Sequence, residues 1–159
     1  MSEEAETKRK FLVVIDETPE CWQALIFAAK RAERTGASVL ALAVMPNTEF
    51  QHWLGIEERM REEALEEGNE MLDKALARLA EHDAETPERK IVFGHRADGI
   101  RAAIAEDPGI SVLVLAAANG PDGPGPLVSA IAGGQSGSFP VPITIVPGSL
   151  TIEEIEAIV

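Results

Sequence analysis

The stretch Val112-Leu-Val-Leu-Ala116, followed by the loop Gly120-Pro-Asp-Gly-Pro-Gly-Pro126, says most about the fold of this chain. The first part is a continuous run of β-branched and aliphatic residues, which is typical of a strand buried on both faces of a parallel sheet. Glycine and proline end that strand abruptly, and the apolar stretch Leu127–Ala132 follows with helical character. A strand, a Gly/Pro turn and a helix in this order indicate a parallel α/β sheet, in which ligands bind beyond the carboxyl ends of the strands.

The same alternation continues along the whole chain. Besides Ile110–Ala116, apolar runs that predict strands are Phe11–Ile15, Ser38–Met45, Lys90–Phe93 and Val141–Val146. Strands separated by helices require right-handed crossovers. We therefore expect a single α/β domain, doubly wound, with a five-stranded parallel sheet of order 3-2-1-4-5 and helices on both faces.

Helical spacing of apolar residues identifies the segments between the strands. The first helix is expected after Thr18, a possible N-cap, and Pro19, with Gly36 at its end. Its apolar face comprises Trp22, Leu25, Ala28, Ala29 and Ala32. A long helix is expected over Glu57–Glu81 and a short one from Asp98 to about Asp107.

Length and local composition predict the domain organisation. At 159 residues the chain is long enough for one domain with a full core. Residues 1–9 are expected to be a flexible N-terminus, 10–148 the folded domain, and 149–159 a tail with a short helix. In the tail, Thr151-Ile-Glu-Glu154 fits a capping box. Leu150, Ile152, Ile155 and Ile158 would form an apolar side that covers either the same subunit or a partner.

Charge and cysteine content narrow the function classes. The net charge of −13 disfavours nucleic-acid binding and adhesion to anionic membranes. No apolar stretch is long enough to span a bilayer, and the polar N-terminus lacks a signal core. The single cysteine, Cys21, excludes an internal disulfide and suits a cytoplasmic protein. The segment Glu57–Glu70 holds seven glutamates and two arginines, which predicts a solvated helix face or, as the alternative, an acidic surface for a partner protein.

Several of these segments together resemble the universal stress protein family. The resemblance rests on Phe11-Leu-Val-Val-Ile-Asp16, on Gly94 after the third strand, on the fourth strand with its glycine loop, and on Pro140-Val-Pro-Ile-Thr-Ile-Val146. It extends from about Lys10 to Gly148. It implies the doubly wound fold, a homodimer formed through the last strand, and for some members the binding of ATP or AMP.

Members that bind a nucleotide share a loop of the form Gly-x2-Gly-x9-Gly-Ser/Thr. Gly120, Gly123 and Gly133 fall at that spacing, with Gly134 in place of the hydroxyl residue and Ser136 two residues further on. In a second alignment, Gly120 is the second glycine of the motif. The third glycine then falls on Ala130, the motif fails, and the last helix is Pro126–Gly137, which starts from the turn Gly123–Pro126.

The candidate site lies between the carboxyl ends of strands one and four. Under the nucleotide hypothesis, adenine lies beside Val44, the ribose near Asp16, and the phosphates on Gly120, Gly123, Gly133, Gly134 and Ser136. Backbone N–H groups of a glycine-rich turn can approach phosphate closely. Asp16 would bind the ribose or help to hold a magnesium ion near the phosphates; its alternative role is to stabilise the N-terminus of the following helix.

Two functions remain open at this point. The first is a regulatory or protective module that binds ATP or AMP in this crevice. It would not be an enzyme, beyond slow ATP hydrolysis at most, because no nucleophile and general base form an evident pair. The second is a degenerate family member that binds no nucleotide and acts through its dimer and partner surfaces.

Overall fold

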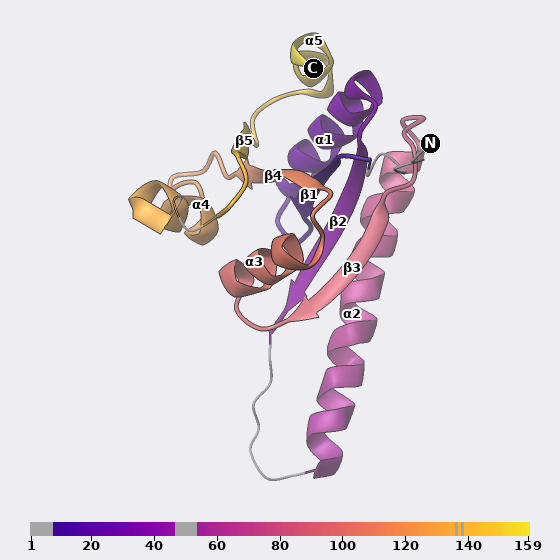
Figure 1. The fold of residues 1–159 in the computed structure, drawn as a ribbon, viewed down its shortest axis with the longest axis vertical. Coiled ribbons are helices and arrows are strands. Elements are labelled where there is room, and N and C mark those ends of the chain that lie inside the picture. Colours follow the sequence, from indigo (N-terminus) through magenta and orange to yellow (C-terminus); the bar gives the residue numbers. More distant parts are fainter. Residues whose placement is uncertain (1–7, 47–53, 136, 138) are drawn as a thin grey trace, which may run out of the picture.

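The structure, a computed structural model, describes residues 8–46, 54–135, 137 and 139–159. Its five described strands form one parallel sheet of order β3-β2-β1-β4-β5, which confirms the predicted order (Figure 1). The strands are β1 (Lys10–Val14), β2 (Ser38–Met45), β3 (Glu88–Phe93), β4 (Ile110–Ala117) and β5 (Ile143–Pro147). The helices are α1 (Cys21–Thr35), α2 (Leu54–Ala80), α3 (Arg96–Glu106), α4 (Pro126–Ala130) with a following π-helical turn η1 (Ile131–Gln135), and α5 (Ile152–Ile158).

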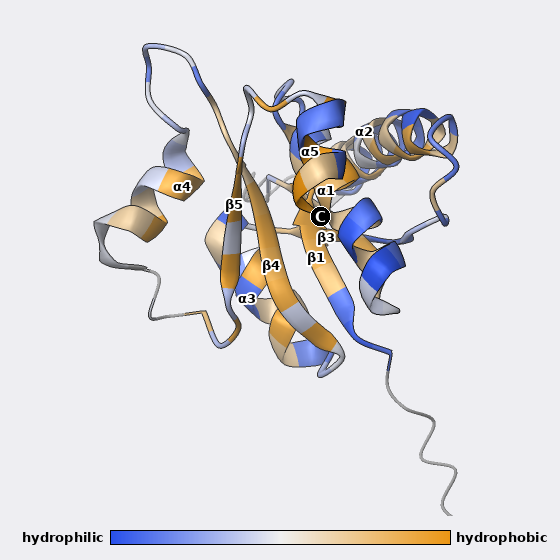
Figure 2. Cartoon of the chain, turned by 90° about the horizontal axis from the view of Figure 1, so that it is seen from above, coloured by the Kyte–Doolittle hydropathy of each residue, from blue (hydrophilic) through white to orange (hydrophobic). Residues whose placement is uncertain are grey.

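Helices cover both faces of the sheet, as predicted. α1, α2 and α5 pack on one face, and α3 and α4 pack on the other, while the central strands carry the most hydrophobic sequence (Figure 2). Successive residues of β1 alternate between the two cores: Val13 belongs to the core under α1, and Leu12 and Val14 belong to the core under α3. Side chains alternate between the faces of a strand, so a continuous apolar run supplies both cores at once.

Several elements begin or end a few residues from their predicted limits. The long helix begins at Leu54 instead of Glu57, and the third helix begins at Arg96 instead of Asp98, which lies in its first turn. The last strand is Ile143–Pro147 instead of Val141–Val146. Pro142 has no N–H to donate, and its carbonyl accepts a hydrogen bond from the N–H of Leu113 just before the regular pairing begins at Ile143.

The predicted cap of the first helix is wrong. α1 begins at Cys21 after Glu20, whose side chain makes no capping hydrogen bond, and Pro19 lies in the turn before the helix. Thr18 donates its N–H and its hydroxyl to Oδ1 of Asp16 instead. Carbonyls of this preceding turn accept from the first N–H groups of the helix, so these donors need no side-chain cap. The predicted C-terminus is confirmed, because Gly36 adopts φ of 72° and donates its N–H to the carbonyl of Ala32.

The C-terminal tail packs on its own subunit. Thr151 and Glu154 form the reciprocal hydrogen bonds of the capping box at the start of α5. Ile155 is fully buried against the core under α1, and Leu150 and Ile152 pack beside it. Ile158 is not part of this core, and 59% of its surface is exposed. None of the helices in the described ranges is both long and apolar enough to cross a membrane.

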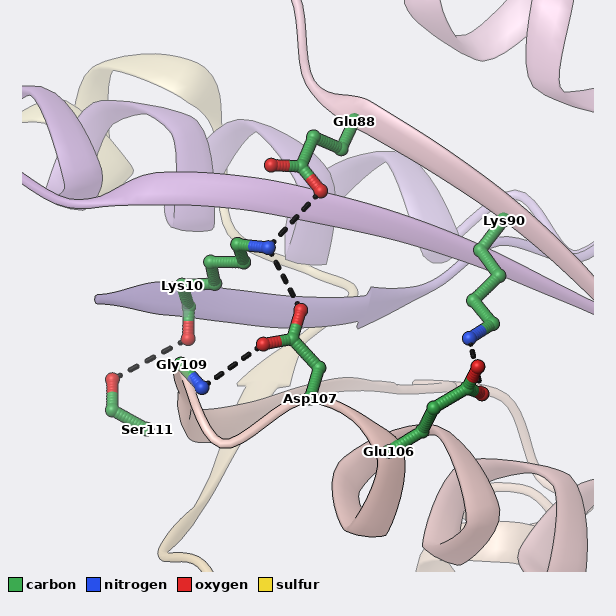
Figure 3. A network of polar contacts seen from close by, with 7 residues as sticks. All are labelled: Lys10, Glu88, Lys90, Glu106, Asp107, Gly109 and Ser111. Atoms are coloured by element: carbon green, nitrogen blue, oxygen red, sulfur yellow. Dashed lines mark hydrogen bonds and ion pairs between the residues drawn. The ribbon is translucent and has the colours of Figure 1, made fainter. Parts of the chain in front are cut away.

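A network of polar contacts ties the amino end of β1 to its surroundings (Figure 3). Nζ of Lys10 lies 2.7 Å from Oδ2 of Asp107 and 3.1 Å from Oε2 of Glu88. The other oxygen of Asp107 accepts from the N–H of Gly109. The hydrogen bond from Lys10 holds the pKa of the Asp107 carboxyl below its usual range, and the same bond raises the pKa of Lys10. These contacts join β1, β3 and the turn between α3 and β4.

Gly148 permits the close approach of the segment after β5 to α1. A Cβ atom at this position would lie 2.7 Å from Cβ of Glu20 and 2.9 Å from the carbonyl oxygen of Ala117. We expect Gly148→Ala to lower the free energy of unfolding by about 1–3 kcal/mol, the usual cost of overpacking. Gly120→Ala is the control, because no atom lies within 4 Å of its Cβ position. Urea unfolding of both variants tests this, and equal stabilities would contradict it.

Asp107 should make stability depend on pH in the acid range. Because its pKa is lowered in the folded state, its contribution is present above the unfolded pKa and is lost as the pH falls through the folded pKa. Asp107→Asn should therefore cost about 1 kcal/mol at pH 7 and much less at pH 3. Glu106→Gln, which removes the more exposed pair with Lys90, should cost less at pH 7. A loss from Asp107→Asn that is equal at both pH values would exclude this ionic role.

Candidate functional site

The carboxyl ends of β1 and β4 face each other across a narrow crevice. The winding of the sheet reverses between these two strands, which is where an open α/β sheet leaves room for a ligand. Asp16 and Thr18 line the crevice on the β1 side, and Pro124–Val128 line it on the β4 side. The crevice has a volume of about 50 Å³, so by itself it holds only a small group.

A wider cavity opens beside the narrow crevice. It has a volume of about 490 Å³ and lies at the carboxyl ends of β2 and β3. Its lining residues are Val44, Pro46, Gly94, His95, Arg96, Ala97, Pro126, Leu127 and Ala130. Arg96, Pro126 and Leu127 line both spaces, so the wide cavity and the narrow crevice are neighbouring parts of one depression.

Asp16 is held in place by two groups in this structure. One carboxylate oxygen, Oδ1, accepts hydrogen bonds from the N–H and the hydroxyl of Thr18, the N–H at 2.9 Å. The other oxygen, Oδ2, lies 3.5 Å from Nη1 of Arg96. The Asp16 side chain is 20% exposed and that of Arg96 39%. The aspartate therefore faces the depression, but with an arginine between it and the wide cavity.

The loop after β4 closes largely on itself. The N–H of Ala118 bonds to the carbonyl of Pro124, and the N–H of Gly123 bonds to the carbonyl of Gly120. Pro121, Pro124 and Pro126 have no N–H to offer. This loop therefore presents fewer backbone donors to a phosphate than its glycine content suggests.

The predicted site residues do not all line the depression. Asp16 lines the narrow crevice and Val44 the wide cavity. Gly120 and Gly123 lie in the closed loop, outside the lining of both spaces. Gly133 and Gly134 lie in η1, where Gly134 adopts φ of 117°. Ser136 lies outside the described residues.

The helix that follows this loop begins at Pro126. This is the start expected from the second alignment, in which the turn Gly123–Pro126 leads directly into the last helix. Gly123 and Gly125 have φ of 85° and 105°, which only glycine adopts easily, and this backbone turns the chain into α4. Gly123, a glycine of the motif, therefore serves the turn into α4 together with Gly125.

Sequence reasoning missed Arg96 and the residues at the start of α4. Gly94 was singled out, and Arg96 follows it by two residues, so position after a strand was the available signal. Its contact with Asp16 is not visible in the sequence, because 80 positions separate the two residues. Gly125, Pro126 and Leu127 were seen only as parts of a loop and a helix.

Cys21 lies beside the crevice, with its side chain almost entirely buried. Burial raises the pKa of its thiol to about 11, which outweighs the lowering effect of a backbone hydrogen bond. The thiol therefore stays protonated near neutral pH and is a poor nucleophile.

The model of the universal stress protein family matches residues 8–147. The chain therefore belongs to the universal stress protein family. No curated protein matches its sequence.

Solved structures share the fold at low sequence identity. UspA from Lactobacillus plantarum is 18% identical with a TM-score of 0.68, over 87% of this chain and 97% of that chain. A universal stress protein in complex with cAMP is 16% identical with a TM-score of 0.61, over 91% and 100% of the two chains. The protein from Archaeoglobus fulgidus in complex with dAMP is 16% identical with a TM-score of 0.56, over 87% and 97%.

Proposed function

We propose that this protein is a regulatory or protective module that binds an adenine nucleotide, ATP or AMP, in the depression at the carboxyl ends of the strands. The observation that carries the proposal is the wide cavity of about 490 Å³, which includes Val44 and adjoins Asp16 and the start of α4. The complexes of similar folds with cAMP and dAMP support the ligand class.

The lining of the wide cavity suits a nucleoside. Val44, Ala97 and Leu127 offer an apolar surface for a flat base, and the narrow crevice beside it holds the Asp16 carboxylate, an acceptor for ribose hydroxyls. A magnesium ion bound with the nucleotide would be shared between the phosphates and Asp16, because the described residues contain no group of three or more His, Cys, Asp or Glu side chains that would hold a metal by themselves.

We infer a binding role without catalysis, apart from slow ATP hydrolysis at most. Near the crevice, the candidate nucleophile is Cys21, whose thiol has its pKa raised to about 11 by burial. The candidate base in the crevice is Asp16, which is engaged by Thr18 and Arg96. His95 lines the wide cavity, where the described lining holds no serine, threonine or cysteine for it to activate.

One observation favours the alternative, a degenerate member that binds no nucleotide. The narrow crevice holds only about 50 Å³, and Asp16 is paired across it. In that case the protein acts through its dimer and partner surfaces, and the glutamate-rich face of α2 is one such surface. The two functions differ in whether nucleotide binds at all.

Filling the wide cavity should abolish binding. Ala130 lines the cavity from α4, and its neighbour Ser129 is exposed and lines neither space. We expect calorimetric titration to detect binding of adenosine and AMP to the natural chain. Ala130→Phe should abolish it, because the ring occupies the space of the base, and Ser129→Phe should leave it unchanged.

Absence of heat with adenosine, AMP and ATP at millimolar concentration would reject the nucleotide proposal and favour the degenerate member. Normal binding by Ala130→Phe would reject the proposed cavity while keeping nucleotide binding. Thermal unfolding of both phenylalanine variants shows whether they are folded.

We also propose a homodimer formed through β5. This strand lies at the edge of the sheet, and Ile145 on it is 42% exposed. An exposed apolar edge strand invites pairing with another chain. The proposal also fits the dimer that the family resemblance implies.

A charge at the sheet edge should separate the subunits. We expect Ile145→Lys to convert the dimer to a monomer at micromolar concentration, as measured by size-exclusion chromatography with light scattering. Leu65→Lys is the matched control, because Leu65 is exposed to the same extent, 43%, but lies on α2. A monomeric natural chain, or a dimer that tolerates both lysines, would count against the β5 interface.

A further inference from the structure

We propose that Arg96 selects the ligand of this depression: it leaves Asp16 to bind a single phosphate group, so that the site takes adenosine monophosphates in preference to ATP. This inference rests on the proposed nucleotide site and names the ligand class of that site. The observations that support it are the position of Arg96 in the lining of both spaces and its ion pair with Asp16.

Arg96 is placed between the two parts of the depression. It is the first residue of α3 and follows the turn Gly94-His95 at the end of β3. Its side chain lines both the wide cavity and the narrow crevice. A base in the wide cavity would therefore have its sugar-phosphate end within the region that this side chain occupies.

Arg96 is also the one guanidinium or ammonium group in the described lining of the two spaces, where the other basic side chain is the imidazole of His95. The acidic residues Asp16 and Glu20 line the same crevice. In a chain with a net charge of −13, an anionic ligand is repelled unless a local cation compensates, and a guanidinium binds phosphate through paired hydrogen bonds.

The loop after β4 offers few backbone donors in place of that cation. Three of its positions are prolines, and the N–H groups of Ala118 and Gly123 are bonded within the loop. Gly133 and Gly134, which the family motif would place on phosphates, lie in η1 outside both linings. Recognition of phosphate therefore depends on a side chain and not on a glycine-rich cradle.

The pair between Arg96 and Asp16 can open at little cost. At 3.5 Å and with the arginine 39% exposed, it is a long, partly solvated ion pair, which contributes little to stability. Asp16 keeps its hydrogen bonds from Thr18 when the arginine leaves. Arg96 is therefore available beside the cavity to bind a phosphate, and Asp16 stays hydrogen-bonded to Thr18 when Arg96 moves from the carboxylate to the phosphate.

A single cation favours a single phosphate. The β- and γ-phosphates of ATP would add negative charge beside Asp16 and Glu20 with no second lysine or arginine among the described lining residues. The added repulsion opposes the triphosphate, whereas AMP places its charge on Arg96. The site therefore distinguishes ligands by phosphate count and not by base alone.

The test is calorimetric titration of the full chain and its variants with adenosine, AMP and ATP at one ionic strength. The natural chain should bind AMP about tenfold more tightly than adenosine or ATP, the effect expected of a hydrogen bond to a charged group. Arg96→Gln should lose that advantage for AMP and keep its affinity for adenosine. Arg96→Lys should retain part of it, because the charge remains without the paired donors.

Arg101→Gln serves as the control. Arg101 lies on the same helix, pairs with Asp98 and lines neither space, so this change should leave all three affinities unaltered. If the natural chain binds neither adenosine nor AMP, the proposed function itself fails. If it binds both equally, binds ATP most tightly, or retains its AMP preference in Arg96→Gln, the inference is overturned while the nucleotide site stands. Loss of adenosine binding by a folded Arg96→Gln also overturns it, because Arg96 then shapes the cavity.

Discussion

The central strand β1 is the constraint on which the rest of the structure depends. It pairs with β2 on one side and β4 on the other, and its side chains enter both hydrophobic cores. The chain can reach both neighbours through right-handed crossovers only by changing the face of the sheet that its helices cover. After β1 the chain turns to α1 on one face and after β4 to α4 on the other, so these two segments diverge and leave the crevice at the ends of the paired strands.

The residues at that crevice show how a family fold is adapted locally. β4 is followed by a loop rich in glycine and proline. Gly123 and Gly125 of this loop adopt positive φ angles, and this backbone conformation turns the chain into α4. The narrow space that results is spanned by the pair of Asp16 and Arg96. The open space lies next to it, beside Val44, so the depression is built from the ends of four strands and not from the loop alone.

The sequence predicts the order of the strands better than it predicts where each helix begins and ends. Strand order follows from the alternation of apolar runs and helical segments, because few arrangements of parallel strands satisfy the handedness rule. Helix boundaries are less determined by the sequence. Thr18 has the chemistry of a cap, yet α1 begins only at Cys21, its first N–H groups bond to carbonyls of the preceding turn, and Thr18 bonds to Asp16. Capping hydrogen bonds and turn hydrogen bonds compete at the start of a helix. Which of them forms depends on the local positions of a few atoms, and the residue types alone do not specify these positions.

The sequence by itself determined the class of fold, the two cores and the place of the candidate site at the strand ends, since apolar periodicity and turn residues act over short distances. It also indicated Asp16 and Val44, which lie at the ends of predicted strands. Only the tertiary structure decided which groups meet there. Arg96 reaches Asp16 from another crossover, while Gly133 and Gly134 lie in η1 outside the lining of both spaces. Such contacts between distant residues depend on how whole elements pack, and spacing along the chain does not contain that information.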